Sequence, residues 1–322
     1  MAAPMSFSSD AAPLVSARGL TKRFAGFTAV HGIDFDVARG EAFGFLGPNG
    51  AGKTSTMRMI GCVSPVTAGT LSVLGMDPAR DGPLIRARIG VVPQTDILDD
   101  ELSTLENLIV YGRYFDIPRG ESRRRAVELL DFAQLTEKAG ARVQTLSAGM
   151  KRRLTIARSL INQPELLLLD EPTTGLDPQA RHLLWDRLYA LKRRGATLVL
   201  TTHYMDEAEQ LCDRLVIMDG GRIAAEGSPR ELIEHHSTRE VLELRFPEMA
   251  GEEQRDGHID AVLTDLGDRI EHLAERVILY TDDGEAASIA VHERGLRPES
   301  VLVRRSTLED VFLRLTGRTL ID

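Results

Sequence analysis

The chain has 322 residues, 43% of them apolar and 27% charged, which excludes intrinsic disorder and leaves room for one large domain or two ordinary ones. No uninterrupted apolar run approaches the roughly 18–20 residues of a membrane-spanning helix, so no transmembrane segment is expected. The net charge is −1 over residues 1–236 (28 basic, 29 acidic) and −8 over residues 237–322 (11 basic, 19 acidic). A neutral main part and an acidic tail argue against a nucleic-acid partner.

The N-terminal part divides into a leader and a set of strands. Residues 1–13 lack a basic start before an apolar core, so we expect a flexible leader and no secretory signal. Residues 14–46 alternate apolar and polar positions in short runs punctuated by glycines, which is typical of strands and hairpins. Beyond them the pattern predicts a helix over 54–62 and short strands over 70–74 and 89–92.

The middle of the chain is predicted to be helical. Apolar positions recur at helical spacing over residues 105–135 and are interrupted by Pro118 and Gly120, so we expect at least two helices, in an insert at about 100–160. Further on, strands alternate with helices, which indicates a parallel sheet covered on both faces. The predicted elements are a helix over 149–162, strands over 165–170 and 197–202, helices over 178–194 and 205–213, and a hairpin over 215–227.

The sequence changes in character after Gly227. Residues 228–236 are predicted to form a short closing helix. The remainder holds the strand candidates VLELRF, RVILYT and SVLVRR between acidic loops, followed by a last helix, TLEDVFLRLTG. This tail is long enough to bury a small core of its own. We therefore expect an α/β domain over 14–236 and a small C-terminal α+β domain over 237–322.

A glycine-rich stretch, GPNGAGKT, follows the apolar run AFGFL and opens the first predicted helix. It matches the phosphate-binding pattern GxxxxGK[ST]. In such a loop glycines let backbone N–H groups converge on phosphate, the lysine reaches the outer phosphates and the threonine hydroxyl ligates Mg²⁺. The alternative, a glycine-rich turn that binds nothing, does not explain the full match with the correct flanks. The loop residues are Gly47, Pro48, Asn49, Gly50, Ala51, Gly52, Lys53 and Thr54.

Two adjacent carboxylates stand where a buried strand ends. Asp170 and Glu171 follow four leucines, at the end of a strand where ligands collect in open parallel sheets. We expect Asp170 to join a magnesium shell and Glu171 to position or activate a water. His203 follows the next strand and so reaches the same edge of the sheet. Alone, these would be solvated loop acids and a structural histidine; beside the phosphate loop, the functional interpretation is favoured, with His203 holding the γ-phosphate.

Further motifs stand in order between residues 14 and 236. They are GPNGAGKT, Gln94 within VVPQTD, LSAGM leading into KRRLTIARSL, LLLLDEP, TGLD and His203. With these motifs the chain resembles the nucleotide-binding subunit of ATP-binding cassette (ABC) transporters. The resemblance implies a P-loop ABC cassette, with a mixed core sheet, an antiparallel β subdomain and a helical insert, which binds ATP and Mg²⁺ and hydrolyses the ATP.

The resemblance also implies a role for each matching residue. Two cassettes close head to tail, so that ATP lies between the phosphate loop of one chain and the LSAGM segment of the other, where Ser147 and Gly149 contact the γ-phosphate. Glu171 is implied as the general base, assisted by His203 and Lys53. The implied metal ligands are Thr54, Gln94 and Asp170. The other implied nucleotide contacts are Ser55, Asp177, which communicates across the dimer, and Phe24, which stacks on adenine.

One position departs from the family pattern. Ala148 stands where the family has glycine, so a methyl group at a helix start faces the nucleotide and disfavours a positive φ. Alanine is the mildest such change, and Ser147 and Gly149 are kept. We therefore predict that ATP turnover survives, at a rate equal to or below that of a glycine variant.

The resemblance narrows to one group of transporters. The stretch from LSAGM to WDRL, the segment THYMDEAEQLCDR and the ending TLEDVFLRLTG look like the ATPases that work with ABC-2 type permeases. Within that group the chain resembles the nodulation lipo-oligosaccharide exporter ATPases and the daunorubicin-resistance exporter ATPases. This implies export, a homodimer, a separately encoded ABC-2 permease on which the helical insert docks, and a peripheral location at the cytoplasmic face of the cell membrane.

Two other functions remain open. A soluble cassette ATPase in translation or DNA repair is one alternative, although such proteins usually carry two cassettes or a long coiled coil, and this chain has one cassette and no sustained heptads. The second is a regulatory cassette that binds ATP with little turnover.

Overall fold

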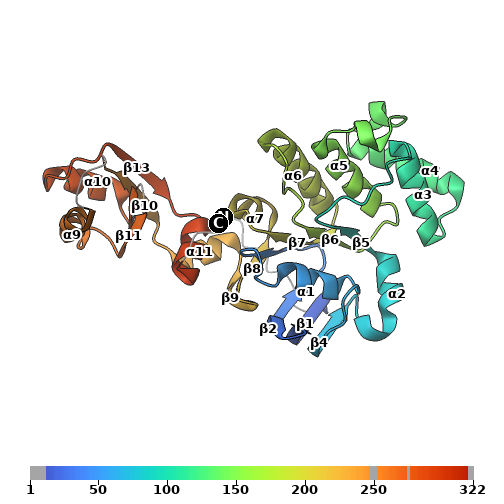
Figure 1. Cartoon of the computed structure of the whole chain (residues 1–322), viewed down its shortest axis with the longest axis horizontal. Helices are drawn as coiled ribbons and strands as arrows, with labels where there is room; N and C mark the ends of the chain where they lie inside the picture. Colours follow the sequence, from blue (N-terminus) through green and yellow to red (C-terminus); the bar gives the residue numbers. More distant parts are fainter. Residues whose placement is uncertain (1–11, 247–251, 274–275, 318–322) are drawn as a thin grey trace, which may run out of the picture. The chain divides into compact units, whose positions relative to one another are not determined.

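The computed structural model describes residues 12–246, 252–273 and 276–317, with the backbone alone for 252–256. Residues 1–11 of the expected leader lie outside the described residues. The chain divides into two compact units, Met1–Glu226 and Gly227–Asp322, and each is described below by itself (Figure 1). The expected functional boundary after His236 stays a prediction.

A six-stranded sheet forms the centre of the first unit, in the order β5-β6-β7-β3-β8-β9. Its strands are β3 (Ala42–Leu46), β5 (Ile89–Val92), β6 (Leu166–Asp170), β7 (Thr197–Thr202), β8 (Arg214–Asp219) and β9 (Arg222–Gly227). The first five in spatial order run parallel, and β3, β6 and β7 are buried along their whole length, which is typical of strands covered on both faces. The predicted parallel core is confirmed. The tight turn at Gly220 and Gly221 sends β9 back along β8, so the sheet is mixed.

Helix α1 (Lys53–Ile60) lies between this sheet and a second, three-stranded antiparallel sheet (Figure 1). The second sheet has the order β2-β1-β4 and consists of β1 (Val15–Phe24), β2 (Phe27–Val37) and β4 (Ala68–Val73). Phe35 of β2 packs against Phe43 and Phe45 of β3, with ring centroids 5.9 and 5.1 Å apart, so the two sheets share one apolar core. The expected antiparallel β subdomain is confirmed.

Helices α5 (Ala148–Ser159), α6 (Pro178–Arg193) and α7 (Met205–Leu211) cover the other face of the six-stranded sheet (Figure 1). One further helix, α2 (Pro78–Arg88), follows β4 and has no counterpart among the predicted elements. Asp77 caps it, because its Oδ1 accepts a hydrogen bond from the Ala79 N–H at 2.9 Å, and Pro78 is its first residue.

The helical insert has its own apolar cluster. It contains α3 (Thr104–Gly112), α4 (Arg119–Phe132) and the short 3₁₀ turns η1 (Arg113–Phe115), η2 (Thr136–Lys138) and η3 (Val143–Thr145). Leu108 of α3 and Leu130 of α4 are buried against Leu154 of α5. The two predicted helices are confirmed. Pro118 precedes the second of them, whereas Gly120 lies inside it and does not break it.

The second unit contains an antiparallel sheet, on which α9 (Glu252–Leu263) and α10 (Gly284–Glu293) pack, and a pair of helices, α8 (Pro229–His236) and α11 (Leu308–Thr316), that pack on each other. The strands, in the order β11-β12-β10-β13, are β10 (Glu240–Arg245), β11 (Arg269–Leu273), β12 (Arg276–Thr281) and β13 (Ser300–Arg305). Leu242 and Leu244 of β10 pack with Ile259 of α9 and Val291 of α10. The expected α+β unit is therefore present.

The expectation of acidic loops between these strands is wrong, because α9 and α10 occupy them. In α10, Asp283 accepts a hydrogen bond from the Ala286 N–H at 2.9 Å, and Ala287 and Val291, four residues apart, are buried. In α10 the acidic residues thus belong to the cap and to exposed positions, and a buried stripe lies beneath them. None of the helices in the described ranges has both the length and the apolar character needed to cross a bilayer.

Candidate active site

The glycine-rich loop joins the end of β3 to the start of α1. Gly50 and Gly52 have φ values of +81° and +98°, in the region that favours glycine. A side chain at Gly52 would also place its Cβ 2.5 Å from the carbonyl oxygen of Ala29 on β2. The loop can therefore follow this path only with glycine at that point, and β2 fixes it from outside.

Lys53, the first residue of α1, reaches back under the loop. Its side chain is 4% exposed, and its Nζ donates hydrogen bonds to the carbonyl oxygens of Gly47 at 2.7 Å and Pro48 at 3.0 Å. The same nitrogen lies 3.8 Å from Oε1 of Glu171. Burial lowers the pKa of Lys53, and the carboxylates of Glu171 and Asp170 oppose that shift. A cation and two carboxylates thus meet beneath the loop.

Asp170 ends β6 beside the start of α1. Its Oδ1 accepts hydrogen bonds from the Thr54 hydroxyl at 3.2 Å and from the Thr201 hydroxyl of β7 at 2.6 Å. Oxygen ligands are what Mg²⁺ prefers, and the spacing between Thr54 Oγ1 and Asp170 Oδ1 is close to the roughly 3 Å between neighbouring oxygens of an octahedral shell. The residues present therefore fit the implied metal.

Glu171, the next residue, receives side chains from three segments. Its Oε2 accepts hydrogen bonds from Gln94 Nε2 at 3.1 Å and from the Thr174 hydroxyl at 3.1 Å, and it lies 3.5 Å from Nδ1 of His203. The His203 imidazole is the chief cause that holds the pKa of Glu171 below its usual range, with Lys53 acting in the same direction. The structure thus brings together Lys53, Thr54, Gln94, Asp170, Glu171 and His203.

Glu171 also departs from ordinary backbone geometry. Its φ is +45°, whereas a non-glycine residue seldom takes a positive φ. Its N–H donates to the carbonyl oxygen of Thr201 at 3.1 Å and is also 3.0 Å from the Thr201 hydroxyl, so the neighbouring strand holds this backbone in place. Thr201 was not expected from the sequence, and Thr174 was named only as part of the TGLD motif, without a role of its own. The sequence did contain one indication of Thr201, because a polar threonine near the end of a predicted buried strand lies at the edge where ligands collect.

Ser147 and Asp177 each begin a helix. Ser147 Oγ accepts from the Met150 N–H at 3.3 Å at the start of α5, and Asp177 Oδ1 accepts from the Ala180 N–H at 2.8 Å at the start of α6. A Cβ added at Gly149 would lie 3.0 Å from that of Ala180, so the two helix starts are close. No hydrogen bond or ion pair among the described residues joins Ser147, Gly149 or Asp177 to the Lys53–Glu171 cluster.

Ala148 fits its position without backbone strain. It is the first residue of α5, it is exposed, and it is not among the described non-glycine residues with positive φ. The backbone at this residue therefore does not take the positive φ that would require glycine. The expected backbone strain from alanine is absent.

Phe24 lies at the end of β1, and its side chain is 51% exposed. The ammonium nitrogen of Lys22 lies 5.0 Å from the centre of its ring. An exposed ring at a hairpin end leaves a face free for stacking, although no interaction among the described residues links Phe24 to the phosphate loop.

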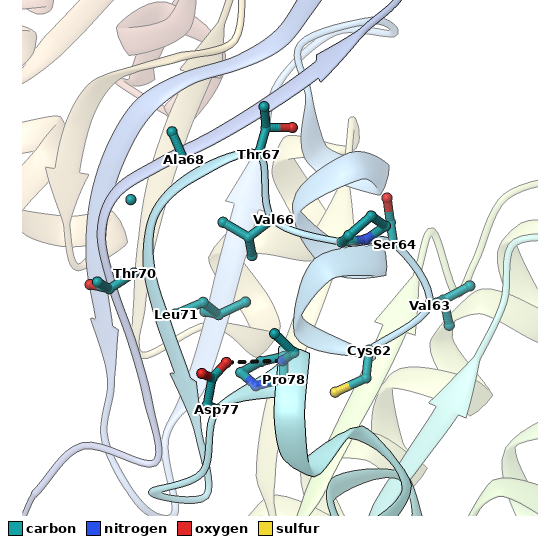
Figure 2. Close-up of a pocket in the computed structure, with 13 residues that line it drawn as sticks. Cys62, Val63, Ser64, Val66, Thr67, Ala68, Thr70, Leu71, Asp77 and Pro78 are labelled. Atoms are coloured by element: carbon teal, nitrogen blue, oxygen red, sulfur yellow. Dashed lines mark hydrogen bonds between the residues drawn. The ribbon is translucent and has the colours of Figure 1, made fainter.

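A pocket of about 530 Å³ lies elsewhere in the first unit (Figure 2). It opens beside the C-terminal end of α1 and is lined by residues 62–71 and 77–79. Cys62 and Asp77 are among its polar or ionisable groups, and Asp77 is engaged in capping α2 (Figure 2). None of the predicted site residues lines this pocket, so it is distinct from the Lys53–Glu171 cluster.

Comparison with protein-family models gives two matches. Residues 30–174 match the family described as ABC transporter. Residues 253–317 match the family described as the C-terminal domain of the nodulation factor export protein NodI. The matches fall in the first and the second compact unit, respectively.

Comparison with curated proteins finds relatives over almost the full length. The chain is 46% identical to a Nod factor export ATP-binding protein I of Ralstonia nicotianae, over 96% of each chain. It is 48% identical to the protein of the same name from Rhizobium sp. (strain N33), over 93% of this chain and 96% of the relative.

Solved structures resemble the first unit. One is a dimeric ATP-binding cassette in a post-hydrolysis state bound to ADP and Pi, with 28% identity and a TM-score of 0.61 over 66% of this chain and 98% of that one. Another is cbiO1 of Clostridium perfringens, part of an ABC transporter complex, with 27% identity and a TM-score of 0.65 over 70% of this chain and 92% of that one. The expected cassette fold is confirmed by these similarities.

Proposed function

This chain belongs to the ATP-binding proteins of ABC transporters, in the family of the Nod factor export ATP-binding proteins, and from that premise we propose that it powers export through a membrane permease by hydrolysing ATP between two copies of itself. The observation that carries the proposal is the cluster beneath the phosphate loop, where Lys53 lies 3.8 Å from the carboxylate of Glu171. Gln94 donates a hydrogen bond to the same carboxylate, and His203 lies beside it. We assign residues 14–236 to the cassette, with its helical insert at about 100–160, and 237–322 to an accessory domain.

The chemistry follows from the position of each group. The loop N–H groups and Lys53 bind the outer phosphates, and His203 donates to the γ-phosphate. A water oxygen attacks the γ-phosphorus, its proton passes to the Glu171 carboxylate, and the bond to the ADP oxygen breaks. The lowered pKa keeps Glu171 in the ionised form, which is the only form that can take up the proton. Thr54, Asp170 and Gln94 would hold Mg²⁺, which neutralises phosphate charge when bound.

The second half of the site is proposed to come from another copy of the chain. Ser147 and Asp177 are exposed, and among the residues that the structure describes their side chains hydrogen-bond only to their own helices. A head-to-tail pair would place Ser147 and Gly149 of one chain on the γ-phosphate held by the other and bring Asp177 to the interface. The similar dimeric cassette bound to ADP and Pi supports this arrangement. Ser55 would complete the phosphate contacts, and Phe24 would stack on adenine.

The membrane partner is proposed to dock on the helical insert. A groove of about 390 Å³ lies along α3, and its lining includes the apolar residues Leu105 and Ile109 and one carboxylate, Glu106. Arg113, Arg119 and Arg123 line it, and none of them forms an ion pair within the described residues, whereas Arg124, next to Arg123, is paired with Glu121 and Glu128. The groove thus suits an amphipathic segment with acidic side chains. We assign that segment to an ABC-2 type permease, which would hold the chain at the cytoplasmic face of the membrane.

The cargo is proposed to be a lipo-oligosaccharide of the Nod factor type, on the strength of the relatives' names. The decisive experiment co-expresses the chain with a candidate ABC-2 type permease from the same genome, purifies the complex from membranes, and measures ATPase activity with and without that cargo. Turnover stimulated by permease and cargo supports the proposal. Binding of ATP without turnover would favour the regulatory alternative, and failure to associate with membranes would favour a soluble cassette ATPase.

The groove has its own test in the same complex. The Arg123→Glu substitution is expected to reduce co-purification with the permease about 10-fold, because it opposes the acidic segment. The matched charge reversal Arg124→Glu, on the same exposed helix, is expected to change it less than about 2-fold. Equal effects of the two substitutions, or loss that depends on anionic lipid and not on the permease, would exclude the proposed docking groove.

A further inference from the structure

Arg152 is a buried cation close to the site but outside the proposed reaction. It lies on α5, one turn beyond Ser147, and its side chain is 4% exposed. Its Nε donates to the carbonyl oxygen of Pro172 at 2.7 Å, and its Nη2 donates to those of Asp170 and Glu171, each at 3.1 Å. The guanidinium thus binds the last residue of β6 and the two residues that follow it.

The remaining nitrogen of the same guanidinium forms hydrogen bonds to a second segment. Nη1 donates to the carbonyl oxygen of Pro93 at 2.5 Å, is 3.5 Å from that of Gln94, and lies 3.3 Å from Oδ1 of Asp96. These residues form the loop after β5, and Gln94 is the residue whose amide reaches Glu171. One planar group therefore connects the backbones on both sides of the Gln94–Glu171 contact.

Two more side chains of α5 hold the same loop. The Thr155 hydroxyl donates to Asp96 Oδ1 at 2.9 Å, and Arg158 Nη1 donates to the carbonyl oxygen of Ile97 at 2.5 Å. Arg152, Thr155 and Arg158 are spaced three residues apart, so they share one face of the helix. The loop is bound to α5 along its length, and α5 is the helix that begins at Ser147.

We propose that Arg152 is a positioning residue for ATP hydrolysis, which ties the Gln94 loop and the Asp170–Glu171 segment to the helix that presents Ser147. This inference rests on the proposed function and adds to it a route by which the permease is coupled to the ATP site. A displacement of the Gln94 loop by the permease would be passed through one rigid guanidinium to the carboxylate of Glu171 and to the start of α5. Lysine cannot replace it, because a single ammonium lacks the fork that reaches both segments.

The matched control is the neighbouring Arg153. It lies on the same helix, but its Nη1 donates to the carbonyl oxygen of Ala133 at 2.7 Å, in the helical insert. Arg152→Lys and Arg153→Lys therefore make the same chemical change, and only the first alters the contacts to Gln94 and Glu171. A purely structural role for Arg152 would lower the melting temperature without separating kcat from KM.

The experiment measures ATP turnover, KM for ATP and thermal unfolding of the full-length chain and these variants. Arg152→Lys is expected to lower kcat about 10- to 100-fold with KM within about 2-fold, because Glu171 is displaced while the phosphate loop is intact. Arg153→Lys is expected to change kcat less than about 2-fold. Asp96→Asn, a milder change, is expected to lower kcat about 3-fold and to be less than multiplicative with Arg152→Lys.

Two outcomes would overturn the inference while leaving the proposed function in place. One is a wild-type chain that hydrolyses ATP with Arg152→Lys and Arg153→Lys equally active. The other is an Arg152→Lys effect that appears in KM alone, with multiplicative behaviour in the Asp96 cycle. A wild-type chain with no turnover at all, with permease present, overturns the proposed function itself.

Discussion

The two halves of the proposed ATP site are held very differently within one chain. Lys53, Asp170 and Glu171 are 4%, 8% and 6% exposed, and each has partners from other segments. Ser147 is exposed, and within the described residues its side chain hydrogen-bonds to its own helix, which it caps. The first half is therefore set when the chain folds, whereas the second half, in the proposed head-to-tail arrangement, is a surface that meets a nucleotide held by another copy of the chain. A substitution in the first half should affect chemistry, and one in the second should affect assembly.

The strongest test of the buried half removes the proton acceptor. Glu171→Gln keeps the size of the side chain and hydrogen-bonding groups for Gln94 and Thr174, but it cannot take a proton from water. We expect the single-turnover rate of ATP hydrolysis to fall about 1000-fold while ATP affinity stays within about 3-fold. Glu165→Gln, on an exposed surface ion pair, is the control. A rate within 10-fold of wild type would exclude Glu171 as the base.

The exposed half is tested by mixing two defective chains. Lys53→Ala removes the buried cation, and Ser147→Asp keeps a good helix cap but sets a carboxylate against the partner's phosphate. Each variant alone should be inactive. In an equimolar mixture about half of the dimers are mixed and each has one intact site, so about one quarter of wild-type activity should return. No recovery in the mixture would contradict the head-to-tail arrangement.

The electrostatics of the buried half predict a pH effect. The pKa of Glu171 is lowered in the folded chain, chiefly by His203, so its stabilisation is present above the ordinary value near 4.5 and is lost as the pH falls through the lower folded value. His203→Ala should raise that folded pKa and move acid unfolding of the cassette to higher pH. The fluorescence of Trp185, the single tryptophan and 8% exposed, reports this transition.

The control for this titration is His31→Ala, at an exposed histidine of β2. It should leave the acid midpoint unchanged. A midpoint that moves equally in both variants, or that falls in His203→Ala, would contradict the assigned cause of the lowered pKa.

The smallest effect is expected at Ala148. Because this residue has ordinary helical backbone geometry and an exposed side chain, Ala148→Gly should raise turnover by no more than about 3-fold and lower helix stability by less than about 1 kcal/mol. Steady-state ATPase rates and thermal unfolding check both numbers. A gain much above 3-fold would mean that the methyl group obstructs the nucleotide in the closed dimer.

Elements with a single uniform pattern could be predicted from the sequence. The run TLVLTT forms β7 with the expected bounds because β-branched and apolar residues suit a strand buried on both faces. Helix α2 escaped prediction because Gly82 and Pro83 lie inside it and Asp81 is non-helical, with φ −107°, so its apolar spacing is interrupted. Helix α10 was not predicted because its buried residues, Gly284, Ala287 and Val291, are small or few and give only a weak apolar period.

Among the site residues, those in one contiguous motif could be predicted from the sequence, whereas some of those brought together by tertiary packing could not. The phosphate loop is contiguous in sequence, so its glycines, Lys53 and Thr54 can be recognised together as one motif. Thr201 and Arg152 were not found, because their roles depend on how segments far apart in sequence align. Thr201 meets Asp170 only because β6 and β7 pair in that register, and no pattern within either strand determines it.

The positive φ of Glu171 has an evolutionary consequence. A left-handed conformation costs an ordinary residue about 1–2 kcal/mol, which glycine does not incur. A descendant of this chain that no longer needed hydrolysis would be under pressure to replace the residue and relax its main chain. Degenerate copies that merely bind nucleotide should therefore accumulate glycine or asparagine at position 171.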